Sequence, residues 1–264
     1  MQLTGRKLGE TAKISVRASL VASAEAAKEW LPTETAPGRE PSGVSVLLLQ
    51  SLTAVAGRVF DEKAWLDPTN RAALQISDIE TGAKYHRRLY RLLDRGFIFE
   101  ERLPAGSAQQ ALAPEQWDKV TRMSDAFPPA LPDDAVVTGA LALLCGDQAG
   151  RLRAPGDSAS YFVFVQKQVE EVTLTVESVG IQPVNFVVER AGRSGRVAGE
   201  RPALTIRINN RPLESKKTGA FRLFGMGDGV RVVWDVRYQA PLQVSGHIRL
   251  LGHFTIALDR LTLR

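Results

Sequence analysis

The residues with the most obvious chemical use are glycines and basic side chains near the C-terminus. Gly225, Gly227 and Gly229 alternate in the stretch FGMGDGV, and Arg222 precedes them. Glycine readily adopts positive φ, and a glycine-rich turn can point several backbone N–H groups at one anion. These residues therefore predict a phosphate-binding loop. A β-meander whose glycines only form tight turns is the alternative.

A second basic group follows in the stretch GHIRLLGHF. Cleavage of RNA without a metal uses the 2′-hydroxyl of the substrate as nucleophile, so the protein has only to orient it and to stabilise charge on the phosphate. We assign hypothetical catalytic roles to Arg17, His247 and Arg249. We assign RNA contacts to Gly246, Gly252 and His253. An exposed turn histidine and an outward-facing strand arginine are the alternatives for His247 and Arg249.

A row of basic residues also marks the middle of the N-terminal half. Ser77-Asp78-Ile79-Glu80 matches a capping box, and Gly96 is a typical residue after a helix end, so the pattern predicts a helix over 77–95. Five cations fall on one face of this helix at spacings of three and four: Lys84, Arg87, Arg88, Arg91 and Arg95. Like charges at these spacings repel one another, which favours phosphate contact over a plain solvated face.

The charge distribution points to the same class of partner. The formal net charge is +5, and the segment from Glu189 onward carries fourteen basic and six acidic residues. An excess of eight positive charges in one part of the chain predicts binding of a polyanion. Lys216 and Lys217 lie in one of two basic, glycine-containing loops and are further candidates for RNA contact. Arginine-rich usage in a GC-rich genome is the alternative explanation.

Several other kinds of site are not predicted. The single cysteine, Cys145, excludes a cysteine-rich zinc site, and no P-loop, GxSxG or HExxH motif occurs. We therefore expect no metal and no cofactor. No apolar stretch reaches the roughly 20 residues that span a bilayer, and the N-terminus lacks the apolar core of a signal peptide. The expected location is the cytoplasm, with no membrane partner.

Hydrophobic periodicity predicts an α+β protein in two parts. A strand is expected at 12–22, followed by helices at 23–31, 44–60, 77–95 and 114–124. A proline-rich linker at 127–134 separates this first region, 1–126, from a second region, 135–264. The second region shows mainly period-two alternation, which predicts a series of strands.

The ending Gly246-HIRLL-Gly252-His253-Phe254 resembles the glycine-rich loop near the C-terminus of the RAMP superfamily of CRISPR-associated proteins. The resemblance implies a ferredoxin-like or RRM-like fold of antiparallel sheets, here with an N-terminal helical insertion and a β-rich C-terminal half. It also implies binding of CRISPR repeat or guide RNA, together with other subunits of a ribonucleoprotein effector.

Three functions follow as hypotheses. The first is an RNA-binding protein that cleaves repeat RNA without a metal. The second is a non-catalytic backbone or scaffold subunit of the same kind of complex. The third is a DNA-binding or assembly protein of a plasmid or phage, with the basic segment around Arg88 facing the DNA.

Overall fold

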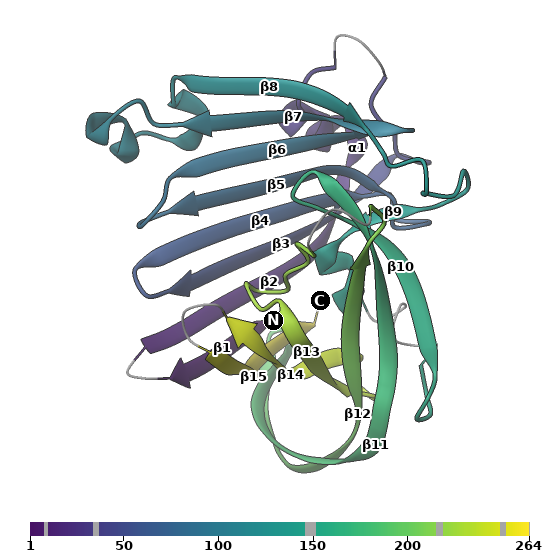
Figure 1. Ribbon diagram of the computed structural model, residues 1–264. Coiled ribbons are helices and arrows are strands. Elements are labelled where there is room, and N and C mark those ends of the chain that lie inside the picture. The colour runs from purple at the N-terminus through teal and green to yellow at the C-terminus, as the bar shows by residue number, and fades with distance from the viewer. Residues whose placement is uncertain (8–9, 34–36, 146–151, 215–218, 249–251, 264) are drawn as a thin grey trace.

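The computed structural model describes residues 1–7, 10–33, 37–145, 152–214, 219–248 and 252–263 (Figure 1). Strands account for 64% of the described residues and helices for 8%, and fifteen strands in this part of the chain join in one mixed sheet. The prediction of an α+β, ferredoxin-like fold with an N-terminal helical insertion is therefore wrong. The described residues form a predominantly β structure.

Eight strands make up the N-terminal part of the sheet, each antiparallel to the strand that precedes it in sequence. Their bounds are β1 Gln2–Lys7, β2 Glu10–Ala22, β3 Ser45–Val55, β4 Arg58–Leu66, β5 Ala73–Thr81, β6 His86–Leu93, β7 Gly96–Leu103 and β8 Lys119–Ala126. The helical segments are short: α1 Ser23–Ala26, η1 Ala27–Glu29, η2 Ser107–Ala111, η3 Pro114–Gln116 and η4 Ala140–Leu144.

The helix predicted at 44–60 is instead the hairpin of β3 and β4. Ala56 and Gly57 form its two-residue turn, with φ of 49° and 71°, and two positive φ values match the twist that a hairpin needs. The apolar run looked helical because both faces of β3 are covered at its start. Val46 packs on one side with residues of α1, and Leu47 packs on the other side in the main core.

The helix predicted at 77–95 spans most of β5, a turn and β6. Side chains alternate between the two faces of a strand, so Arg87 and Arg91 share one face of β6 and Arg88 lies on the other. Lys84 and Arg95 lie in the turns before and after β6. The five cations therefore do not form one stripe. The helix predicted at 114–124 is also wrong, because only η3 is helical there and β8 follows.

Seven further strands form the C-terminal part of the sheet: β9 Val137–Gly139, β10 Ser158–Val165, β11 Gln168–Arg190, β12 Arg193–Pro212, β13 Asp228–Asp235, β14 Ala240–Ile248 and β15 Gly252–Leu263. β11 to β15 close into a five-stranded ring, because residues 187–190 of β11 pair in parallel with residues 260–263 of β15. β15 also pairs with β1, which joins the ring to the N-terminal sheet.

The long hairpin of β11 and β12 curls to make this closure, as the bottom of Figure 1 shows. A register shift between Val176 and Ser178 bends β11, and Gly199 on β12 has a φ of 109°. Bulges and glycines are the usual devices for bending a strand strongly. The curled part surrounds a small core of its own, which includes Phe186, Leu242 and Leu261.

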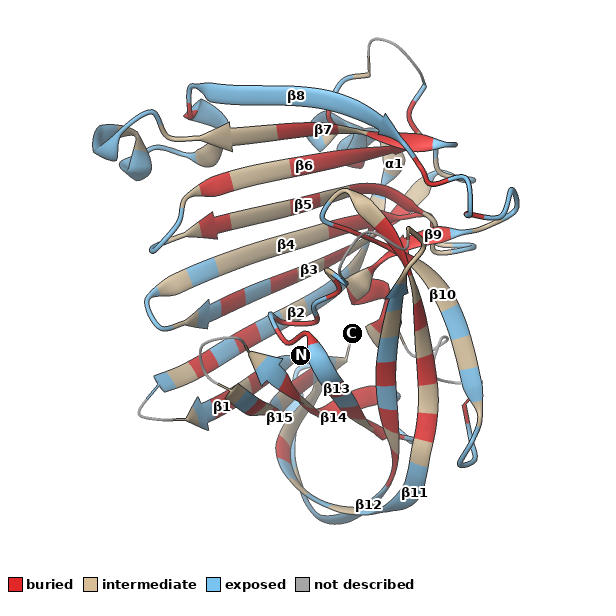
Figure 2. Ribbon diagram, viewed as in Figure 1, coloured by how far each residue is buried: buried red, intermediate tan, exposed pale blue. Residues whose placement is uncertain are grey.

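The main core lies between the inner face of the N-terminal sheet and the segment β9–η4–β10 (Figure 2). Phe164 of β10 packs against Tyr90 and Phe97, with ring centroids 5.2 and 4.9 Å apart. Gly139 brings β9 so close to the sheet that a Cβ atom there would lie 3.3 Å from that of Ala64. The core therefore draws on both predicted regions, 1–126 and 135–264.

Candidate functional site

The arginines of β6 have protein partners in place of the predicted phosphates. Arg87 lies 3.4 Å from Glu100 and 3.3 Å from Glu115, and Arg88 donates a 2.7 Å hydrogen bond to Glu101. Arg91 is buried, donates to the Leu74 carbonyl at 2.8 Å, and its guanidinium lies 4.2 Å from the centroid of the Trp30 ring.

The two cations in the flanking turns differ from each other. Arg95 is exposed and pairs with Asp133 at 2.5 Å. Lys84 is exposed, and the described residues supply no hydrogen-bond or ion-pair partner for it. Of the five predicted RNA contacts in this segment, only Lys84 therefore presents a cation without a partner in the described structure.

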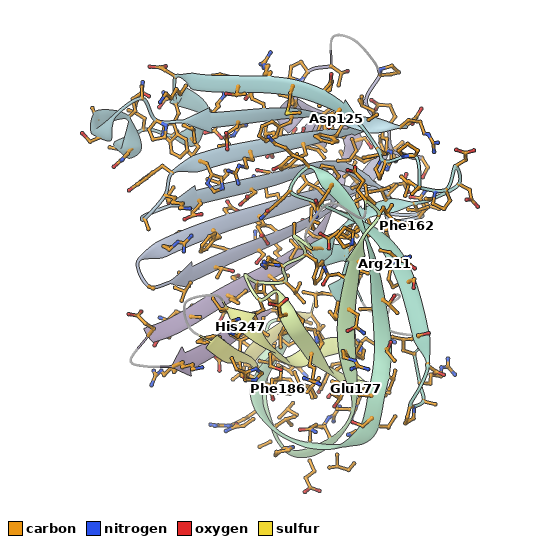
Figure 3. The ribbon with its side chains drawn as sticks, viewed as in Figure 1. Asp125, Phe162, Glu177, Phe186, Arg211 and His247 are labelled. Atoms are coloured by element: carbon orange, nitrogen blue, oxygen red, sulfur yellow. The ribbon has the colours of Figure 1, made fainter. Side chains whose placement is uncertain are left out.

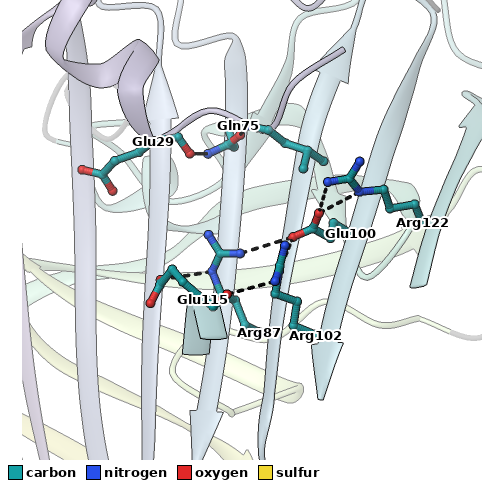
Figure 4. Close-up of polar contacts among 8 residues, drawn as sticks. Glu29, Gln75, Arg87, Glu100, Arg102, Glu115 and Arg122 are labelled. Carbon is teal, nitrogen blue, oxygen red and sulfur yellow. Dashed lines mark hydrogen bonds and ion pairs between the residues drawn. The ribbon is translucent and has the colours of Figure 1, made fainter. Parts of the chain in front are cut away.

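Glu100 is the centre of the ion pairs on the outer face of the sheet (Figure 4). Its side chain is buried and lies 3.4, 2.8 and 2.7 Å from the guanidinium groups of Arg87, Arg102 and Arg122. Burial alone would raise the pKa of this carboxyl, but hydrogen bonds from Arg102 and Arg122 hold it below its usual range. The arginines that looked like an RNA-binding stripe thus contribute to stability.

Substitution of Glu100 should show this role. Glu100→Gln leaves three guanidinium groups around a neutral buried side chain, so we expect the free energy of unfolding to fall by about 2–4 kcal/mol in urea titrations. The control is Glu101→Gln, which removes a partly exposed carboxylate of the next residue and should cost about 1 kcal/mol or less. Equal effects of the two substitutions would contradict this account.

The glycines near the C-terminus allow positive φ values and close packing of the backbone. Gly225 and Gly229 have φ of 78° and 62°, and the N–H of Gly227 donates to the carbonyl of His247 at 3.1 Å. Gly252 follows the same pattern with a φ of 70°. Gly246 is packed so tightly that a Cβ atom there would lie 2.9 Å from the Cβ of Met226. The turn interpretation therefore accounts for this cluster without an anion.

Gly246 offers a direct test of that interpretation. Gly246→Ala should destabilise the protein by about 1–3 kcal/mol, because the added methyl group overlaps Met226 and Val230. Gly195→Ala is the matched control, since it lies on a strand with open space around it and should change stability by at most about 1 kcal/mol. Calorimetry measures both. Unchanged stability of Gly246→Ala with weaker RNA binding would favour the original RNA-contact hypothesis.

The proposed catalytic residues do not converge. His247 and His253 are exposed cross-strand neighbours on β14 and β15, with His247 on the ring as Figure 3 shows. Arg17 lies on β2, two residues after Ser15. Ser15 pairs with Gln2 of β1, and Gln2 pairs in turn with Arg260 of β15, so Arg17 lies near or past the level of Arg260. That is at least seven residues from His253 along β15, on the order of 23 Å. Arg249, Lys216 and Lys217 lie outside the described residues.

Five arginines of the C-terminal part also pair with carboxylates. Arg207 and Arg231 lie 3.2 and 2.7 Å from Glu177, and Arg201 lies 3.2 Å from Asp235. Arg211 pairs with Glu171, and Arg260 pairs with Glu189. Much of the positive charge counted in the sequence is thus neutralised within the fold.

Four other arginines lie near the β11–β12 turn and in the turn after β13, and we name them the basic rim: Arg190, Arg193, Arg196 and Arg237. All four are exposed, and within the described residues none has a carboxylate partner. Arg196 donates to the amide oxygen of Asn185 at 2.7 Å. Arg190 and Arg193 are directly opposite one another on β11 and β12, so their charges repel in the absence of an anion.

The basic rim borders a pocket at the open end of the ring. Its volume is about 380 Å³, and Val188, Arg190, Arg237, Tyr238 and Leu263 line it. Tyr238 packs edge-on against Phe186, and the guanidinium groups of Arg201 and Arg237 lie 5.0 and 6.0 Å from its ring centroid. Arg190 and Arg237, which have no acidic partners in the described structure, can hold an anionic group beside the Tyr238 ring and the apolar walls. Such a group would carry an apolar or aromatic portion.

Sequence reasoning found this surface only in part. The segment 190–202 stood out as a basic, glycine-containing loop, but Arg237 and Tyr238 are more than 30 positions further along the chain. The available signal was Ala191-Gly192, which forms a two-residue hairpin turn with φ of 48° and 75°. That turn places Arg190 and Arg193 side by side, but the closure onto β15 is not visible in the sequence.

A separate group of polar residues lies on the inner face of the N-terminal sheet. Glu62 of β4 and Asp78 of β5 are cross-strand partners that line a cavity of about 100 Å³. Tyr90, Phe164 and Arg222 line the same cavity. Burial raises the pKa of Glu62 to about 7, with further contributions from the negative charges of Asp78 and Asp61.

The stability of the protein should therefore depend on pH near neutrality. The carboxyl of Glu62 has an ordinary pKa of 4.5 and a pKa of about 7 in the folded protein, so the folded state retains a proton over this range. The contribution of Glu62 to stability should be highest below pH 4.5 and should be lost as pH rises through 7. Relative to Glu62→Gln, we expect a loss of about 1–3 kcal/mol between pH 5 and pH 8.

Denaturant titrations at several pH values measure this difference. Glu25→Gln is the control, because Glu25 is an exposed carboxylate of α1 whose ion pair is with Lys28, at 2.5 Å. Parallel stability curves for the wild type and Glu62→Gln would contradict the account.

The structure was also compared with the expectations about metal sites and membrane spans, and the chain was compared with known proteins. The described residues contain no group of three or more His, Cys, Asp or Glu side chains that could hold a metal ion. No helix in the described part of the chain is long and apolar enough to cross a membrane. Comparison of the chain with protein-family models, curated proteins and solved structures gave no match.

Proposed function

We propose that this protein binds RNA through the basic rim, and that it acts there as a binding module. The observation that carries the proposal is the contrast between the basic rim and the other arginines. Five described arginines of the C-terminal part have carboxylate partners, whereas the four of the basic rim have none in the described structure. Two of these four, Arg190 and Arg237, line a pocket. Phosphate groups would supply the missing negative charge.

The geometry favours single-stranded RNA among nucleic acids. A single strand can place a phosphate beside Arg190 or Arg237 and an unstacked base near Tyr238, which is the combination of contacts that single-stranded nucleic acids use. The β6 segment is no longer a groove-facing helix, so the argument for a duplex-binding protein loses its main element. Cleavage has less support than binding, because Arg17 lies far from His247 and His253.

The wider role stays a prediction. The resemblance to the RAMP superfamily implied a ferredoxin-like fold, and the fold is different, so only the short glycine-containing ending supports a CRISPR effector with other subunits. A cytoplasmic location would fit an RNA-binding role.

Removal of the basic rim should weaken RNA binding. We expect the triple variant Arg190→Ala, Arg193→Ala, Arg237→Ala to bind a fluorescent single-stranded RNA at least tenfold more weakly than the wild type. The slope of log K against log salt should fall by about 2, since each phosphate contact on a single strand contributes about 0.7. Fluorescence anisotropy between 50 and 300 mM salt gives both quantities.

The matched control removes three exposed cations elsewhere, by Lys13→Ala, Lys119→Ala and Arg153→Ala. This variant loses the same charge and should keep most of the affinity and the slope. Equal losses in the two triple variants would assign binding to net charge alone. Absence of salt-dependent RNA binding by the wild type would overturn the proposal, and equal affinity for duplex DNA would reject the preference for RNA.

A further inference from the structure

The strand β8 ends the sheet on one side, and its outer edge has no partner strand in the described structure (Figure 1). All 8 residues of β8 are exposed. The strand pairs with β7 over its whole length without a bulge, and it contains no proline. Bulges, prolines, short strands and covering segments are the usual means by which proteins protect a free edge. Because β8 has none of these in the described structure, it can accept another strand.

The pairing of β8 with β7 shows which backbone groups face outward. The N–H of Phe127 donates to the carbonyl of Arg95 at 3.0 Å, in the same register as the two strands. Hydrogen-bonded pairs alternate along an antiparallel ladder, so the odd-numbered residues of β8 point their N–H and C=O groups at β7. The N–H and C=O groups of Val120, Arg122 and Ser124 therefore point away from β7 and are available to a second strand.

The charged side chains of β8 suit pairing with a second copy of the same strand. Lys119 and Asp125, near opposite ends of β8, lie on one face and have no ion-pair partner in the described structure. The carboxylate of Asp125 accepts a 2.9 Å hydrogen bond from the N–H of Ala126 and is otherwise open to solvent. An antiparallel pair of β8 strands with a two-fold axis at Arg122 places Lys119 of each copy opposite Asp125 of the other. Such positions are non-hydrogen-bonded pairs, in which side chains lie closest.

We propose that the outer edge of β8 is a dimer interface, at which two copies of the chain pair antiparallel and join their sheets. In this register Val120 of one copy exchanges backbone hydrogen bonds with Ser124 of the other, and the two Arg122 residues bond to each other. The side chains of Val120 and Met123, which are 44% and 39% exposed, would be partly covered. The same sequence thus supplies both the hydrogen-bonding groups and their complement.

Electrostatics selects this register over its neighbours. A shift of one copy by two residues along the strand removes both ion pairs between Lys119 and Asp125. The cost of the register is the approach of the two Arg122 side chains at the axis. Glu100 lies 2.7 Å from the guanidinium of Arg122 within each chain, and its negative charge offsets part of this repulsion.

The interface consists of one strand from each copy, so it belongs to the small end of specific interfaces. We therefore expect a dimer that dissociates on dilution. Sedimentation velocity of the full chain without RNA, between about 2 and 200 μM in low salt, should show a shift from monomer to dimer with concentration. A monomer at every concentration would overturn the proposal.

Reversal of charge tests the register. Lys119→Asp and Asp125→Lys each place like charges opposite one another twice per dimer, so each variant alone should dimerise about tenfold more weakly than the wild type. An equimolar mixture of the two variants restores both ion pairs and should dimerise about as strongly as the wild type. Lys13→Asp is the control, because it makes the same change of charge at an exposed lysine of β2 and should leave the dimer unchanged. Failure of the mixture to recover dimerisation would overturn the proposed pairing.

A proline at the free edge tests the backbone contact. Ser124→Pro removes an N–H that points away from β7, so the pairing with β7 should persist while the dimer is lost. The unfolding temperature, measured by calorimetry at a concentration where the wild type is monomeric, should show that the variant is folded. A Ser124→Pro dimer of unchanged affinity would assign dimerisation to another surface. Since these experiments contain no RNA, their outcome is independent of the function proposed for the basic rim.

Discussion

The rest of the structure depends on the pairing of β15, the last strand. Along one edge β15 pairs with β14, and along the other edge it pairs first with β1 and then, at residues 260–263, with the end of β11. The contact with β1 attaches the N-terminal sheet, and the contact with β11 closes the ring. Both contacts join segments far apart in sequence, so they carry a large loop-closure cost that the two hydrophobic cores have to offset.

The need to cover the outer face of the N-terminal sheet explains why its arginines form ion pairs with carboxylates. An exposed β-sheet of this size needs its outer face covered or charged, and here ion pairs between carboxylates and guanidinium groups link β6, β7 and β8. Glu100, with ion pairs to three arginines, is the clearest example. Positive charge in the sequence is therefore a poor guide to function until the internal pairs are known.

The proposed RNA site follows from a comparison of charges with partners. At the basic rim, the arginines have no carboxylate partners in the described structure, which suits an external anion. Two of them, Arg190 and Arg237, line the pocket beside Tyr238.

The sequence alone determined the β character of the C-terminal part, since period-two alternation predicted strands there, and it determined the excess of arginine. It did not reveal the strands of the N-terminal half. β3 is covered on both faces and loses its alternation, and the arginines of β6 happen to recur at helical spacing. Only the tertiary structure decided which arginines stay available, because a cation is neutralised by whichever carboxylate the register of neighbouring strands places opposite it. The same is true of the pocket at the basic rim, whose residues come from β11, β15 and the turn after β13, and meet only because β11 curls back onto β15.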